Sequence, residues 1–173
     1  IADGPHPIHA GIGMHTGSLI MGITGDEFRM DTATISDTVN TAARIESLTK
    51  YYKTSLLLSG ETLRHISSHE KYHLRHLGKV QLKGKYNQLS IIECLNGNSE
   101  ADLRLKMETL NHFRKAMQHY QEQEFENALQ LFKAILEIDP RDHPSAYFQE
   151  NALKYLKHGV PENWAGVESM ASK

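Results

Sequence analysis

Asn40 and Arg44 are the residues whose types and spacing best fit chemistry on a phosphorylated compound. Ser36 and Asp37 are residue types that begin helices, and the apolar residues after them predict a helix over residues 38–51. Side chains four residues apart on a helix share one face. A guanidinium is planar and always charged, which suits phosphate oxygens, and a carboxamide both donates and accepts hydrogen bonds. Without further context, the same pair would be an ordinary solvated helix face.

Lys85 is a second candidate for contact with a phosphate. It lies in the segment 83–87, which reads as a hairpin turn between two strands. An ammonium on a long side chain reaches a phosphate without needing bidentate geometry. The alternative is a charged hairpin tip that only discourages pairing between sheet edges.

Four histidines, at positions 65, 69, 73 and 76, raise the question of a metal site. The first two are spaced as a helical metal pair would be. Ser67 and Ser68 are expected to end that helix, and no carboxylate–histidine motif surrounds it. We therefore interpret these histidines as surface residues and predict no metal site within the chain.

The elements that carry these residues predict a mixed α and β unit. Alternating apolar residues predict strands over 8–14 and 19–23, joined as a hairpin by a turn at 16–18. The remaining pattern predicts strands over 54–59, 72–77, 80–82 and 89–95 and a short helix over 60–66. The glycines at 11, 13 and 17 are expected to allow close backbone approach and the turn.

The hydrophobic period changes near residue 96. Residues 1–96 hold ten basic and nine acidic residues, whereas residues 97–173 hold nine and twelve. Apolar residues then recur at three- and four-residue steps, which predicts helices that include one over 145–156. We divide the chain into 1–96, a linker over 97–102, a helical segment over 103–157 and a tail over 158–173. Trp164, in the tail, is expected to be a packing anchor.

The helical segment resembles a tetratricopeptide unit. The resemblance rests on Ala116, Tyr120, Phe125, Ala128, Phe132, Leu136 and the run at 139–142. One unit and part of the next are too few for a free-standing solenoid, which needs about three. The segment is therefore either a helical hairpin packed on the first segment or a groove that binds a protein partner.

Composition excludes several classes of protein. The formal net charge of −2 excludes a strongly basic nucleic-acid footprint, and 39% hydrophobic residues exclude a disordered chain. No apolar run is long enough to cross a bilayer. The single cysteine, Cys94, excludes an internal disulfide and fits either a reducing compartment or a chain that is indifferent to redox conditions. We expect a cytoplasmic location.

Residues 8–96 resemble the catalytic domain of class III nucleotide cyclases, which comprise the adenylate and guanylate cyclases. The matching motifs are 9–17, 22–25 and 35–44, followed by 77–78 and 82–85. The resemblance implies an α+β fold: part of a ferredoxin-like sheet with helices, here followed by an α-helical hairpin extension. It also implies attack of a ribose 3′-hydroxyl on the α-phosphate of a nucleoside triphosphate, giving a cyclic nucleotide and pyrophosphate.

The same resemblance implies roles for five residues. Asn40 and Arg44 match the family's transition-state asparagine and arginine, and Lys85 matches its triphosphate-binding lysine. Ala33 and Ile35 fall at substrate-binding positions. Ala33 departs from the family, which carries a hydrogen-bonding residue there, so the base is in doubt; ATP is favoured over GTP because bacterial cyclases mostly use it.

The family's two metal-binding aspartates precede anything that matches Ile1, and Asp3, Asp26, Asp31 and Asp37 do not match them. We therefore expect a carboxyl-terminal fragment of a cyclase that is inactive by itself. The longer parent, which could be anchored in a membrane, would bind Mg²⁺ or Mn²⁺.

We also expect a homodimer or intertwined oligomer, because the family pairs two catalytic domains and each site takes residues from both. The alternative is a degenerate, cyclase-like module for regulation or protein interaction. Ala33 favours that alternative, whereas Asn40, Arg44 and Lys85 favour the enzyme.

Overall fold

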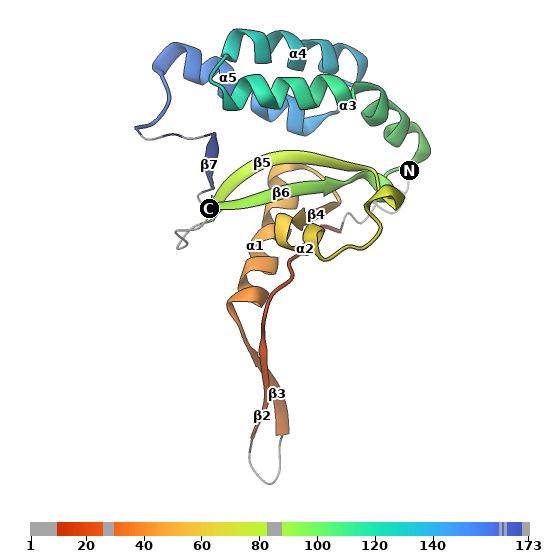
Figure 1. Ribbon diagram of the computed structural model, residues 1–173, viewed down its shortest axis with the longest axis vertical. Coiled ribbons are helices and arrows are strands. Elements are labelled where there is room, and N and C mark those ends of the chain that lie inside the picture. The colour runs from red at the N-terminus through yellow and green to blue at the C-terminus, as the bar shows by residue number, and fades with distance from the viewer. Residues whose placement is uncertain (1–9, 26–29, 83–87, 163, 165, 171–173) are drawn as a thin grey trace, which may run out of the picture.

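A computed structural model describes residues 10–25, 30–82, 88–162, 164 and 166–170 of the chain (Figure 1). The described helices and strands are, in chain order, β1 (Ile12–Met14), β2 (Ile20–Gly25), β3 (Met30–Ile35), α1 (Asp37–Tyr52), β4 (Leu56–Ser59), α2 (Gly60–Arg64), η1 (His69–Lys71), β5 (Leu74–Leu82), β6 (Gln88–Cys94), η2 (Leu95–Gly97), α3 (Glu100–Gln121), α4 (Phe125–Ile138), α5 (His143–His158) and β7 (Val167–Met170).

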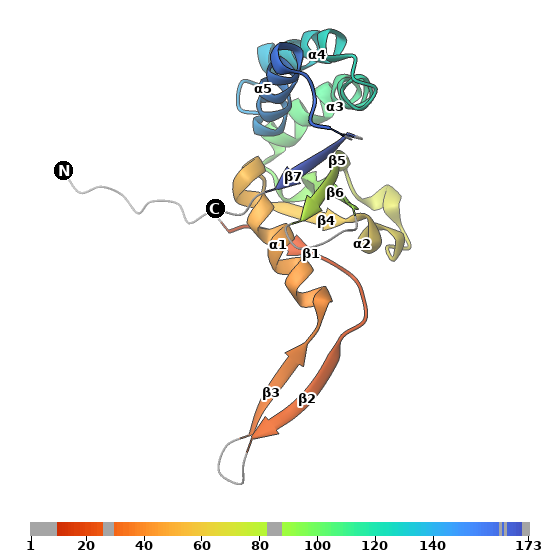
Figure 2. The same ribbon diagram turned by 90° about the vertical axis from the view of Figure 1, so that its left-hand side faces the viewer.

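A five-stranded mixed sheet forms the centre of the molecule, with the strand order β1-β4-β6-β5-β7 (Figure 2). The two outer pairs, β1 with β4 and β5 with β7, are parallel, and the inner pairs are antiparallel. The expected α+β fold with a mixed sheet and helices is therefore confirmed.

The two faces of this sheet pack against different helices. Successive side chains of a strand point to opposite faces. Leu57 and Ile91 belong to the large core shared with α1 and α3–α5, whereas Leu58 and Ile92 belong to a smaller core with Leu63 of α2. The helix α1 and the three carboxyl-terminal helices thus cover one face of the sheet together.

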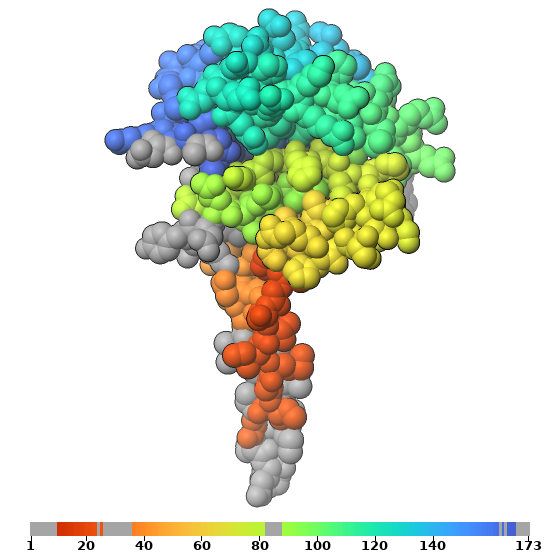
Figure 3. Space-filling model, viewed as in Figure 1, coloured from red at the N-terminus to blue at the C-terminus, as the bar shows by residue number. Residues whose placement is uncertain are grey.

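The predicted hairpin over 8–14 and 19–23 is wrong. Within the described residues, β1 pairs in parallel with β4, and β2 pairs antiparallel with β3 over six residue pairs, from Ile20–Ile35 to Gly25–Met30. The alternation of apolar and polar residues identified these strands but not their partners. A period of two residues is satisfied equally by pairing β2 with β1 or with β3. The β2–β3 ribbon projects from the end of the molecule opposite α3–α5 (Figures 1 and 3).

Two further strand predictions need correction. The strands predicted over 72–77 and 80–82 are one strand, β5, which begins at Leu74 and continues through a bulge between His76 and Lys79. Gly78 adopts φ +92° inside that bulge, a conformation that L side chains rarely adopt. The tail also contains β7, which pairs with β5 although no strand was predicted there.

The three helices after the sheet pack around aromatic side chains. Phe132 stacks on Phe148 with ring centroids 6.0 Å apart, and Tyr120 contacts the edge of Phe148 at 5.3 Å. α3 begins at Glu100 with Ser99 as its N-cap, so it starts inside the expected linker over 97–102. The helix predicted over 145–156 extends from His143 to His158. None of the described helices combines the length and apolarity required to cross a membrane.

Candidate active site

The start of α1 is fixed immediately after β3. Ser36 is its N-cap, and the Ser36 hydroxyl accepts a hydrogen bond of 2.9 Å from the backbone nitrogen of Thr38. The hydroxyls of Ser36 and Thr38 both donate to the carbonyl oxygen of Ser18, at 2.9 and 2.6 Å. The helix terminus is therefore tied to the loop before β2, and Asn40 lies in the first turn of a well-anchored helix.

Glycines in and beside β1 let α1 lie directly on this strand. A Cβ atom on Gly13 would be 2.2 Å from the backbone nitrogen of Glu46, and one on Gly11 would be 1.9 Å from the Thr49 hydroxyl. Side chains therefore do not fit at either position unless α1 moves. Close backbone approach at these glycines was predicted from the sequence, and it determines the distance between α1 and the sheet.

Asn40 and Arg44 lie on the outer side of α1. The side of α1 that faces the sheet is buried through Thr41, Ile45, Leu48, Thr49 and Tyr52. Asn40 and Arg44 are both exposed and stand one helical turn apart. The helix thus presents a neutral amide and a permanent cation on one accessible face, an arrangement suited to a sugar hydroxyl and a phosphate.

The other three predicted site residues are described less fully. The backbones of Ala33 and Ile35 pair with Gly22 and Ile20 in the β2–β3 ribbon, two strand positions apart. Their side chains lie outside the described part of the structure, and so does all of Lys85. The structure therefore brings Asn40 and Arg44 together and places β3 directly before their helix, while the role of Lys85 stays a prediction.

Two of the four predicted surface histidines lie within hydrogen-bond distance of the backbone. His65 Nδ1 lies 2.9 Å from the carbonyl oxygen of Glu61, and His69 Nε2 lies 2.7 Å from that of Leu63. Both side chains are exposed. They do not form a metal-ligand group with other described residues.

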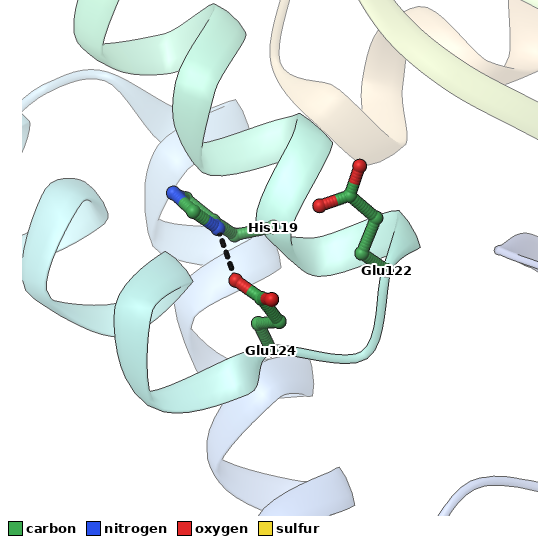
Figure 4. A group of neighbouring side chains, drawn as sticks. All are labelled: His119, Glu122 and Glu124. Atoms are coloured by element: carbon green, nitrogen blue, oxygen red, sulfur yellow. Dashed lines mark hydrogen bonds and ion pairs between the residues drawn. The ribbon is translucent and has the colours of Figure 1, made fainter.

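A different histidine group lies at the turn between α3 and α4 (Figure 4). His119, Glu122 and Glu124 place ligand atoms within 4.8 Å of one another. His119 Nδ1 is 2.6 Å from a Glu124 oxygen, and hydrogen bonds from Asn127 and His119 hold the pKa of Glu124 below its usual value. Because both glutamates are exposed and the histidine is already paired with Glu124, we interpret these three side chains as a hydrogen-bonded cluster on the surface of the helix turn.

The residues around Asn40 do not fit a divalent metal ion. The guanidinium of Arg44 offers no lone pair and repels cations, whereas Mg²⁺ and Mn²⁺ prefer carboxylate oxygens. Asp37, the acidic residue in the first turn of α1, lies at the N-terminus of the helix. We therefore derive no reaction step through a metal held by these residues.

A cavity of about 370 Å³ lies elsewhere, between α5, β7 and the end of α1. Its lining includes Tyr147, Tyr155, Trp164 and Glu168 and does not include Asn40 or Arg44. The face of α1 that carries the candidate site is thus separate from this cavity. The cavity was not expected from the sequence because β7, which supplies Glu168, was not predicted.

Comparison with known proteins gives a specific match. Residues 2–96 match the sequence model of the family described as "Adenylate and Guanylate cyclase catalytic domain". That range includes β1–β6, α1 and α2, and therefore includes Asn40 and Arg44.

Individual relatives extend the match. The chain is 32% identical over 151 residues to "Adenylate cyclase, terminal-differentiation specific" of Dictyostelium discoideum, covering 87% of this chain and 7% of that protein. It is 42% identical over 87 residues to "Adenylate cyclase" of Anabaena cylindrica, covering 50% and 17%. The chain therefore spans only a small part of the length of these relatives.

Among solved structures, a bacterial light-regulated adenylyl cyclase is similar. The sequence identity is 24%, the TM-score is 0.42, and the match covers 54% of this chain and 44% of the other.

Proposed function

The chain belongs to the adenylate and guanylate cyclase catalytic domain family, and from this membership we propose that it is the carboxyl-terminal part of a nucleotide cyclase. The parent enzyme would convert a nucleoside triphosphate into a 3′,5′-cyclic nucleotide and pyrophosphate. The observation that carries this proposal is the exposed pair of Asn40 and Arg44, one turn apart on the anchored helix α1.

Arg44 would stabilise the transferring phosphate. In the reaction, the ribose 3′-oxygen bonds to the α-phosphorus, the bond from that phosphorus to the bridging oxygen breaks, and pyrophosphate leaves. The hydroxyl proton is released to solvent. Negative charge on the α-phosphate oxygens is stabilised when a planar cation is already in place, so the guanidinium lowers the barrier by electrostatics and positioning.

Asn40 would orient the ribose. A carboxamide can donate to the sugar ring oxygen and accept from a hydroxyl, and either contact restricts rotation of the sugar. Because Asn40 and Arg44 are carried by one rigid helix, the sugar and the α-phosphate would be held at a fixed separation. Fixed separation favours in-line attack.

The residues that bind the divalent ions would lie outside the candidate site of this chain. Mg²⁺ or Mn²⁺ supplies charge stabilisation in phosphoryl transfer when it is bound. Since the donor set at Asn40 and Arg44 does not fit a metal, we propose that the parent's metal-binding carboxylates belong to other residues and that residues 1–173 alone are inactive. Lys85 would complete the contacts to the triphosphate.

We propose that a second copy of the chain forms the other wall of the site. The β2–β3 ribbon exposes apolar side chains on both of its faces, with Ile20 76%, Met21 67% and Ile23 72% exposed. An isolated two-stranded ribbon is marginally stable in water, and large exposed apolar side chains gathered on one projecting element are typical of interfaces. β3 leads directly into α1, so a copy that covers the ribbon would also lie beside Asn40.

We propose that the substrate is ATP rather than GTP. The two relatives described above are named adenylate cyclases. Ala33 provides no hydrogen-bonding side chain, so selection between bases would rest on other contacts and is expected to be weak.

A regulatory module without catalysis is the second candidate. Ala33 favours it, because loss of a base contact is expected in a degenerate nucleotide site. In that case α3–α5 would be the interaction surface, as the tetratricopeptide-like pattern suggests.

The deciding experiment is an assay of the full-length parent with Mn²⁺ and either ATP or GTP, in which the cyclic nucleotide is quantified. The enzyme proposal predicts cyclic AMP, with a smaller yield of cyclic GMP. Nucleotide binding without either product would instead establish the regulatory module.

A further inference from the structure

Glu168 is a buried carboxylate held by neutral donors. It lies in β7 with 7% of its surface exposed. The Tyr120 hydroxyl donates to it at 2.6 Å and the Tyr155 hydroxyl at 3.2 Å, with longer contacts of 3.4 and 3.5 Å from Tyr147 and Asn151. Four side chains from α3 and α5 therefore converge on this one anion.

Among the residues that the structure describes, no lysine, arginine or histidine forms an ion pair with Glu168. The ion pairs found there do not include Glu168, whereas the buried Glu93 is paired with both Arg75 and Lys106. Burial, followed by the charge of Glu168, raises the pKa of Tyr155 to about 12, so this hydroxyl keeps its proton and donates it to the carboxylate. The hydrogen bonds satisfy the carboxylate oxygens of Glu168, but its negative charge is buried without an ion-pair partner.

Glu168 also lines the cavity of about 370 Å³, a volume within the usual range of small-molecule pockets. Four of its twelve lining residues are aromatic: Tyr51, Tyr147, Tyr155 and Trp164. The rings support one another: the centroids of Tyr51 and Tyr147 are 5.1 Å apart, and those of Tyr155 and Trp164 are 5.3 Å apart. The lining thus includes two pairs of contacting rings beside the carboxylate.

We propose that this cavity binds a small organic cation with a methylated ammonium head group, whose charge Glu168 neutralises. Ammonium groups are attracted to the faces of tyrosine and tryptophan rings, and aromatic cages are the usual recognition device for methylated amines. The ligand would supply the ion-pairing cation that no described residue gives Glu168. Because the lining comes from α1, α5, β7 and both long strands of the sheet, a bound ligand would join these elements.

Other charges at the cavity define the chemistry further. Glu162 and Lys154 also line it, and both are exposed. A metal ion would require several carboxylate or carbonyl oxygens around one point, whereas the oxygens of Glu168 already accept hydrogen bonds from Tyr120 and Tyr155. The ammonium of Lys154 would repel a cation bound in this cavity. Removal of the Lys154 charge should therefore strengthen binding of the cation.

Fluorescence of Trp164 provides the test, since it is the only tryptophan of the chain. The 173-residue chain is titrated with choline chloride, with its uncharged isostere 3,3-dimethylbutan-1-ol, and with sodium chloride at matched ionic strength. We expect a saturable change with choline and a raised thermal midpoint. The isostere and the salt should produce neither effect.

Variants then identify the charge partner. Glu168→Gln keeps the shape of the side chain and should weaken choline binding about tenfold or more, the loss expected for a charge-assisted contact. Glu162→Gln, the matched control at the exposed rim, should change the affinity less than about threefold. Lys154→Met should tighten binding.

Equal binding of choline and its isostere, or unchanged affinity in Glu168→Gln, would overturn the proposal. Absence of any saturable response in the native chain would overturn it as well. The comparison of choline with its isostere uses only the native chain, so the proposal remains testable if Glu168→Gln does not fold.

Discussion

The guanidinium of Arg75 donates hydrogen bonds to both carboxylate oxygens of Asp142, at 2.7 and 2.9 Å, although 67 positions separate the two residues. Arg75 lies in β5 and Asp142 is the N-cap of α5. The same guanidinium donates to Glu93 of β6, and its Cζ lies 4.5 Å from the centre of the Phe113 ring. The cyclase-like sheet and the helices that follow it are therefore joined by a buried network of charges.

Removal of Arg75 should destabilise the whole chain. The Arg75→Ala variant leaves the buried Asp142 without its cation and Glu93 with Lys106 alone, and the expected loss is about 3–5 kcal/mol in the free energy of unfolding. Urea denaturation followed by circular dichroism measures it. The exposed ion pair of Arg64 with Glu61 supplies the control, because Arg64→Ala should cost at most about 1 kcal/mol. Equal losses in the two variants would disprove the importance of the buried network.

Asp142 should make the stability sensitive to acid. Burial opposes ionisation, but the charge of Arg75 and the hydrogen bonds from Arg75 and Ser145 outweigh it and hold the pKa of Asp142 below its usual value. The resulting stabilisation is present above the unfolded-state pKa of about 4 and is lost as the pH falls through the lower folded-state pKa. The free energy of unfolding, measured between pH 7 and pH 2.5, should therefore fall more steeply for the native chain than for Asp142→Asn. Parallel curves would contradict this assignment.

Some of this architecture could be predicted from the sequence, and some could not. The period of the apolar residues located α1, and the motif around it located Asn40 and Arg44. The alternation of apolar residues does not identify which strands pair, so the sequence-based prediction paired β2 with β1 instead of β3. Arg75, Asp142 and Glu168 look like surface charges in the sequence, because their burial depends on partners that lie far away along the chain.

Gly13 should be intolerant of a side chain because α1 lies directly on it. The Cβ atom of Gly13→Ala would meet the backbone of Glu46, so the helix must shift, at an expected cost of about 1–3 kcal/mol. Gly97→Ala is the control, since a Cβ atom there would have no neighbour within 4 Å. Denaturant unfolding of the two variants measures the difference. A Gly13→Ala chain as stable as Gly97→Ala would show that α1 is not set by this contact.

The β2–β3 ribbon should carry the contact between two copies of the chain. The double variant Ile20→Ser/Ile23→Ser removes exposed apolar surface from the ribbon and should shift the sedimentation of the chain from dimer to monomer. Leu153→Ser/Leu156→Ser makes the same chemical change on exposed positions of α5 and should leave the dimer intact. If the α5 variant dissociates and the ribbon variant does not, the interface lies on the helices.

The turnover of Arg44→Ala in the full-length parent tests the central claim most directly. With saturating ATP and Mn²⁺, the account predicts that kcat for cyclic AMP falls by about 10²–10³, the scale of losing one preorganised transition-state contact. Arg104→Ala, an exposed arginine of α3, should retain the native kcat. A kcat for Arg44→Ala within about threefold of the native value would contradict the account, because α1 would then present its cation to no reacting phosphate.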